Sequence, residues 1–121
     1  MARATVEWDD GHIVANLREF DKKLERRVDV LMDYEAAYAT SYIKSTAPWT
    51  DRTGAARTGL IAISNNLGSG SFELLMSYSV YYGIYLELAN NGRYAVIGPA
   101  MRIIGEKIMS DLNGLIDGMK V

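Results

Sequence analysis

The chain of 121 residues contains no cysteine, a single histidine and only two prolines. Without cysteine, disulfide bonds and thiolate-bound metals are excluded. Histidine chemistry would depend on His12 alone. The chain also has no Gly-x-x-x-x-Gly-Lys phosphate loop and no Gly-x-Ser-x-Gly nucleophile elbow. We therefore expect a protein that is not an enzyme and that uses no cofactor or metal.

Long hydrophobic runs and a strong charge of one sign are also missing. No apolar run approaches the roughly 20 residues that a membrane span requires, and the N-terminus lacks the apolar core of a signal peptide. The net charge of −2 argues against a protein that coats nucleic acid. We expect one folded domain over residues 1–121, made and kept in a cytoplasm, with no membrane contact.

An apolar stripe predicts a long amphipathic helix near the N-terminus, over about 11–46. A short strand, Thr5 to Trp8, would precede it, and Asp9-Asp10-Gly11 would supply its N-cap. At 1.5 Å per residue the helix would be roughly 50 Å long, so it must bend, break or extend beyond the body. The stripe is formed at three- and four-residue steps by Ile13, Leu17, Phe20, Leu24, Val28, Leu31, Met32, Ala36, Ala39 and Ile43.

Two further sets of residues lie on this helix. Tyr34, Tyr38 and Tyr42 form a row that either edges the core or contacts a neighbouring subunit. Lys22, Lys23, Arg26 and Arg27 suggest a phosphate-binding patch, but acidic neighbours nearly cancel their charge. A solvated helix face is the favoured interpretation of these cations.

Strands dominate the second half of the chain, over about 60–97. Residues 60–67 and 72–80 predict two strands, the second with Phe72, Leu74, Met76, Tyr78 and Val80 on one face. A third strand is expected at 93–97, after a short helix or strand at 81–88, of which we favour the helix. Gly98-Pro99 opens a C-terminal helix over about 99–118. The fold class is therefore α+β, with both helices packed on a small antiparallel sheet of three to four strands.

An extended loop over about 47–59 links the two halves. Pro48 disfavours helix before it, and Gly54 and Gly59 permit unusual backbone angles. Trp49, Arg52 and Arg57 are of types enriched at the energetic centres of protein interfaces. The loop is either a solvated crossover or an arm that reaches a partner.

Few residues are candidates for chemistry. His12 stands beside the expected helix start without an obvious partner, so a capping or surface role is favoured. Asp29 and Asp33 lie one turn apart, as many surface carboxylates do. Glu87, in an apolar and tyrosine-rich segment, is expected to pair with Arg57 or Arg93 in a structural or interfacial role.

Three ordered motifs carry a family resemblance. They are Ala47-Pro48-Trp49-x-Asp51-Arg52-Thr53-Gly54-x-Ala56-Arg57, then Tyr82-Gly83-Ile84-Tyr85-Leu86-Glu87, then Arg93-Tyr94-Ala95-Val96-Ile97-x-Pro99-Ala100. With the flanking helices, they make nearly the whole chain resemble the head–tail joining proteins of long-tailed bacteriophages, also called neck or minor tail components.

The resemblance implies a non-enzymatic virion protein. Such proteins form rings, usually of six or twelve copies, between the portal–connector stack and the tail, and DNA passes through the ring without sequence-specific binding. The implied partners are copies of the chain, connector or head-completion proteins and tail proteins; the implied location is the virion neck, and the host cytoplasm before assembly. The expected interface residues are Pro48, Trp49, Arg52, Gly54, Arg57, Gly59, Tyr82, Tyr85, Glu87, Arg93 and Tyr94.

Two alternatives remain. The first is a tail-completion or tail-terminator ring protein. The second, from another class, is a small DNA-binding regulator that uses Lys22, Lys23, Arg26, Arg27, Arg52 and Arg57. Salt-dependent binding to duplex DNA would favour the second alternative.

The central loop generates a mutational prediction. Arg57→Glu should leave the isolated domain folded but block assembly, because it reverses a charge on the expected contact arm. Electron microscopy of the assembled protein checks this, and rings of normal appearance would contradict it.

Overall fold

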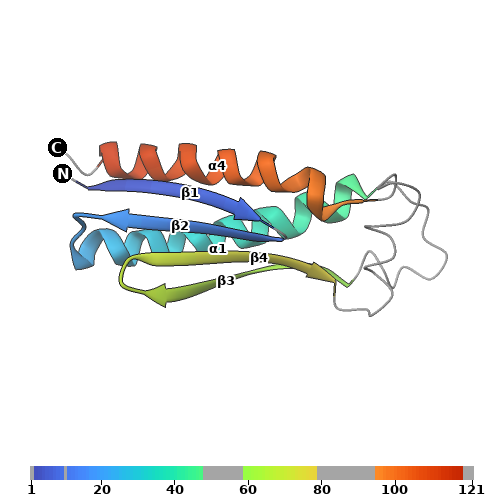
Figure 1. Ribbon diagram of the computed structural model, residues 1–121, viewed down its shortest axis with the longest axis horizontal. Coiled ribbons are helices and arrows are strands. Elements are labelled where there is room, and N and C mark those ends of the chain that lie inside the picture. The colour runs from blue at the N-terminus through green and yellow to red at the C-terminus, as the bar shows by residue number, and fades with distance from the viewer. Residues whose placement is uncertain (1, 10, 48–58, 79–94, 119–121) are drawn as a thin grey trace.

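The computed structural model describes residues 2–9, 11–47, 59–78 and 95–118 of the chain. Within these ranges the sheet has four strands, β1 (Arg3–Asp9), β2 (His12–Arg18), β3 (Leu60–Gly68) and β4 (Ser71–Tyr78). β1 and β2 form one antiparallel hairpin, and β3 and β4 form another. The two hairpins join through an antiparallel β2–β4 pairing, which gives the order β1-β2-β4-β3 (Figure 1).

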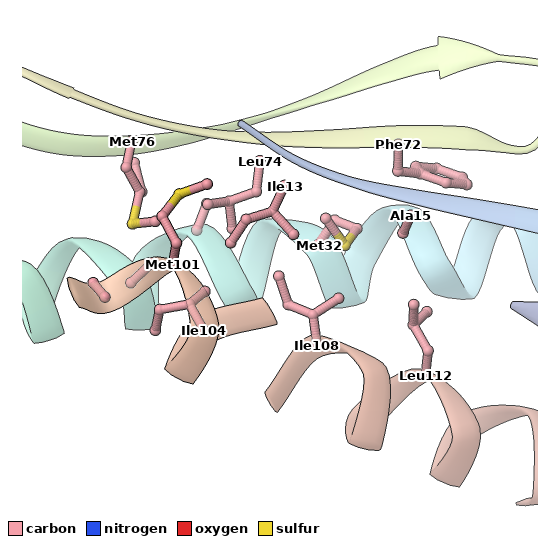
Figure 2. Close-up of a cluster of buried hydrophobic side chains, with 14 of the residues drawn as sticks. Ile13, Ala15, Met32, Phe72, Leu74, Met76, Met101, Ile104, Ile108 and Leu112 are labelled. Atoms are coloured by element: carbon pink, nitrogen blue, oxygen red, sulfur yellow. The ribbon is translucent and has the colours of Figure 1, made fainter. Parts of the chain in front are cut away.

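Two helices, α1 (Lys22–Thr46) and α4 (Ile97–Gly118), pack on one face of this sheet. α1 lies along β3 and β4, whereas α4 lies along β1. The core between the layers brings Ile13 and Leu74 of paired strands against Met32 of α1 and Ile104 and Ile108 of α4 (Figure 2). All five side chains are at most 1% exposed. Burial of their apolar surface is the main force that holds the two layers together.

The long N-terminal helix predicted over 11–46 is wrong in its first part, because residues 12–18 form strand β2. Ile13 and Leu17 fit a helical period of four, but Ala15 between them is also buried, which completes a strand period of two. Gly11, at φ +86°, completes the turn between β1 and β2, and a side chain there would meet the Met76 carbonyl oxygen. Asp9-Asp10-Gly11 therefore does not cap a helix.

α1 begins after Asp21, whose carboxylate accepts a hydrogen bond from the Leu24 amide at 2.8 Å. At 25 residues the helix is about 37 Å long, well short of the length expected from the sequence, and it runs as one continuous element. The predicted apolar stripe is confirmed within this shorter range, where Leu24, Val28, Met32, Ala36, Ala39 and Ile43 are buried.

Several other predictions are confirmed. The expected strands near Thr5–Trp8, 60–67 and 72–80 correspond to β1, β3 and β4, and Pro99 lies in the first turn of α4. Two of the four strands nevertheless precede α1, so the sheet does not arise from residues 60–97 alone. The strand predicted at 93–97 is wrong for its described part, since Ala95 and Val96 are outside any strand and Ile97 begins α4. The central loop at 48–58 and the segment 81–88 lie outside the described residues.

Strand β3 is an edge strand, and it contains no charged residue and no proline to deter pairing with another chain. α1 shields part of this edge. The Thr40 hydroxyl accepts a hydrogen bond from the Ala62 amide at 3.0 Å and lies 2.8 Å from the Ala36 carbonyl oxygen, to which it donates. A helix side chain thus satisfies the middle of the edge and fixes the distance between α1 and β3.

The buried face of β4 gives a stability prediction. Met76 is 2% exposed, so Met76→Asp would place a carboxylate in the core without a partner, at a cost of several kcal/mol. We expect the variant not to fold, as measured by circular dichroism and thermal melting. Ser77→Asp, on the adjacent half-exposed position, is the matched control and should melt close to the wild type. Wild-type melting of Met76→Asp would contradict this account of the core.

Candidate interaction surfaces on the two sides of the sheet

Of the eleven residues expected at an interface, the structure describes only Gly59, which is buried in the turn that enters β3. The other ten lie outside the described residues, and their roles stay predictions: Pro48, Trp49, Arg52, Gly54, Arg57, Tyr82, Tyr85, Glu87, Arg93 and Tyr94. Within the described residues, the candidate contact surfaces are the outer side of the helices and the outward face of the sheet.

A shallow groove lies on the outer side of the helix layer. It has a volume of about 610 Å³, and Val30, Leu31 and Tyr34 of α1 form its floor together with Leu115 of α4. Val30 is 71% exposed and Tyr34 is 58% exposed. Large apolar side chains gathered in one exposed row are typical of a surface that contacts another molecule.

Three cations, Lys23, Arg26 and Arg27, line the same groove. They precede Val30 on the same side of α1, because residues three or four apart on a helix are neighbours on one face. The cations therefore lie at the end of the groove nearest the start of the helix. No ion pair with a carboxylate of the described residues neutralises any of the three. The groove thus combines an apolar floor with free positive charge at one end.

A buried ionic cluster joins the two helices beside this groove. Lys107 of α4 donates to both carboxylate oxygens of Glu35 in α1, at 3.0 and 3.2 Å, and to Asp111 at 2.7 Å. Its ammonium also lies over the rings of Tyr34 and Tyr38, 4.9 and 4.4 Å from their centroids. The cluster fixes the spacing of α1 and α4, and with it the width of the groove.

Glu35 is fully buried, which raises the pKa of its carboxyl to about 7. Burial disfavours the ionised form, and a hydrogen bond shared with Asp111 raises the pKa further, while Lys107 opposes both effects. The same shared hydrogen bond lowers the pKa of Asp111. Below about pH 7 the two carboxyl groups therefore hold one proton between them, and Lys107 balances the remaining negative charge.

The tyrosine row lies at the edge of the core, as one of the two sequence interpretations expected. Tyr38 stacks on Tyr42 with ring centroids 6.3 Å apart, and Tyr42 packs against the core. Tyr34 and Tyr38 remain 58% and 39% exposed. The row edges the core at one end and forms outward surface at the other, while contact with a neighbouring subunit stays a prediction.

The outward face of the sheet is the second surface. Ile61 and Ile63 of β3 are 44% and 43% exposed there. Strand pairing places Ile63 opposite Leu75, Leu75 opposite His12, and His12 opposite Asp9, so one row crosses all four strands. This row runs from an isoleucine on one edge of the sheet to a carboxylate on the other.

His12 has a partner, contrary to the expectation from sequence. It begins β2, not a helix, and its Nδ1 lies 2.8 Å from an Oε2 atom of Glu73 in β4. The second carboxylate oxygen of Glu73 accepts from Asn65 of β3 at 3.4 Å. The surface role favoured for His12 agrees with this position, and the contact ties three strands together on the outward face.

Sequence reasoning overlooked Glu35. It occupies a four-residue step between Leu31 and Ala39 and thus replaces an apolar residue on the buried side of α1. Lys107 and Asp111, one helical turn apart, are its complement on α4. The signal that could have revealed this cluster is a charged residue on an otherwise apolar stripe.

Metal binding finds no support among the described residues, where no group of three or more histidine or acidic side chains could hold an ion. Asp33, considered with Asp29, instead accepts a hydrogen bond from the Ser64 hydroxyl at 2.5 Å. Among the described helices, none is both long and apolar enough to cross a bilayer. No family model matches the chain, and no curated protein sequence or solved structure matches it.

The pKa of Glu35 yields a pH prediction. Because that pKa is raised from 4.5 to about 7, the folded state takes up a proton between these values, and the free energy of unfolding should fall as pH rises through this window. Glu35→Gln, which mimics the protonated carboxyl, should stabilise the protein at pH 8 by on the order of 1 to 3 kcal/mol and change little at pH 4.

Urea unfolding at several pH values measures this effect. Glu106→Gln, an exposed acid on α4 paired with Arg102, is the matched control and should leave the pH dependence unchanged. The account of the cluster would be contradicted if Glu35→Gln were less stable than the wild type at pH 8. It would also be contradicted if the free energy of unfolding of Glu35→Gln fell with pH between pH 5 and 7 as steeply as that of the wild type.

Proposed function

We propose that the protein is a structural subunit of the neck of a long-tailed bacteriophage, where copies form a ring between the portal–connector stack and the tail. The three ordered sequence motifs supply the family resemblance. The observation that supports the proposal most is the presence of two unlike apolar surfaces on opposite sides of one protomer, the groove on the helices and the outward face of the sheet.

A closed ring places a specific demand on its subunit. Cyclic contacts repeat head to tail, so each copy must carry two different surfaces that fit one another. A single self-complementary patch would give two-fold dimers instead. The groove lies on the helices and the exposed isoleucines lie on the outward face of the sheet, which suits subunits that stack side by side around an axis.

The proposed ring has six or twelve copies and contacts connector or head-completion proteins on one side and tail proteins on the other. DNA passes through its lumen without sequence-specific binding. The net charge of −2 is compatible with this passage, since a basic channel would hold the phosphates electrostatically. The protein would reside in the host cytoplasm before assembly and in the virion afterwards.

The alternative of a tail-completion or tail-terminator protein uses the same ring geometry one level further down the particle. A DNA-binding regulator fits less well. Three of its six proposed cations, Lys23, Arg26 and Arg27, border a mainly apolar floor of Val30, Leu31 and Tyr34, whereas DNA-contacting surfaces are mostly polar and basic.

The proposal predicts the composition of the mature particle. Quantitative mass spectrometry of purified virions should find the chain at about six or twelve copies per particle, against a portal or capsid protein of known number. Finding it in infected cells but absent from particles would contradict the proposal. Salt-dependent DNA binding by the purified protein would favour the regulator instead.

A further inference from the structure

The charges on the two surfaces are complementary. At one end of the groove stand Lys23, Arg26 and Arg27, free of ion pairs within the described chain. On the sheet, Glu7 and Asp9 of β1 are exposed carboxylates, likewise without an ion pair among the described residues. The groove points away from its own sheet, so these cations and carboxylates cannot meet within one copy.

The two surfaces also agree in length. On the sheet, the carboxylates of β1 and the isoleucines of β3 are three strand spacings apart, which is about 14 Å. On α1, the distance from Lys23 to Tyr34 is eleven residues, or roughly 16 Å along the helix axis. Each surface therefore has a charged end and an apolar end, and the two surfaces are of similar overall extent.

From these observations we propose that the groove of one copy receives the outward face of the sheet of the next copy. α1 then lies across the strands of its neighbour, with Lys23, Arg26 and Arg27 at Glu7 and Asp9. Val30 and Tyr34 cover Ile61 and Ile63 at the other end. In the proposed ring this contact would be the interface between neighbouring subunits. Its assignment to a neck ring rests on the proposed function.

The contact is heterologous, because a groove meets a sheet and not another groove. A pair of copies retains one free groove and one free sheet face, so the contact can repeat until a ring closes. The charged end is solvent-accessible, and it should therefore steer association and weaken as salt rises.

Reciprocal charge reversal in the full-length chain tests this contact. One double variant, Arg26→Glu/Arg27→Glu, makes the groove acidic, and a second, Glu7→Lys/Asp9→Lys, makes the sheet face basic. Each alone should weaken self-association at low salt by about tenfold or more, measured by sedimentation velocity. Mixed in equal amounts they should associate again, because the acidic groove then fits the basic sheet face and the two unaltered surfaces fit each other.

Controls come from α4, where Arg102 and Glu106 are exposed and paired with one another. Arg102→Glu and Glu106→Lys make the same charge changes away from both surfaces and should associate like wild type. Melting curves establish that each variant folds. If Glu7→Lys/Asp9→Lys does not fold, Glu7→Gln/Asp9→Asn replaces it and should show a loss of the same sign. Mixing it with the groove variant should restore pairs, through the two unaltered surfaces, but no larger assembly.

Three results would overturn the contact. They are a wild-type chain that stays monomeric at every concentration, mixed variants that fail to associate, and a Glu7→Lys/Asp9→Lys variant that associates normally, which would indicate groove-to-groove pairing. A fourth result would have the same force: the wild-type chain binds duplex DNA or anionic vesicles, and the groove variant loses that binding while it still self-associates. A chain that assembles as described but is absent from virions would leave the contact standing and refute the neck function. A chain that is present in virions but does not assemble through this contact would refute the contact alone.

Discussion

The packing of both helices against one face of the sheet is the constraint on which the other features depend. Ile13 and Leu74 from paired strands meet Ile104 and Ile108 of α4 in a core that is almost fully buried. Once this face is covered, the opposite face of the sheet and the outer side of the helix layer form the outward surfaces of the described chain. Hydrophobic burial in the core thus determines where a partner can bind.

An ionic cluster between the two helices adds to the packing of the core. Glu35, Lys107 and Asp111 join α1 to α4 directly beside the groove, whose floor takes residues from both helices. Loss of Lys107 would be costly, since it would leave the buried Glu35 and its neighbour Asp111 without the cation that they share. The cluster therefore holds the two walls of the groove in register. Its sensitivity to pH near neutrality follows first from the burial of Glu35, which raises the pKa of that carboxyl, and then from the hydrogen bond that Glu35 shares with Asp111.

The sequence predicted most elements of the fold but not their order. The alternation around Met76 predicted β4, and Gly98-Pro99 predicted the start of α4 to within two residues. Ile13 and Leu17 fit two periods. The strand is selected by the pairing of β2 with the adjacent β1 and with β4, which is distant in sequence. Glu35 could have been found as a charge on an apolar stripe, whereas its partners on α4 follow from tertiary packing alone. The motifs that carry the family resemblance lie mostly outside the described residues.

The central claim is that this chain acts by fitting a groove on one copy to a sheet face on the next, within a ring at the phage neck. Electron cryomicroscopy of the neck in purified particles tests it most directly. The account predicts a ring of this α+β fold in which α1 of each subunit crosses β1 to β3 of its neighbour. A neck built wholly from other proteins, or copies related by two-fold axes through their grooves, would contradict it.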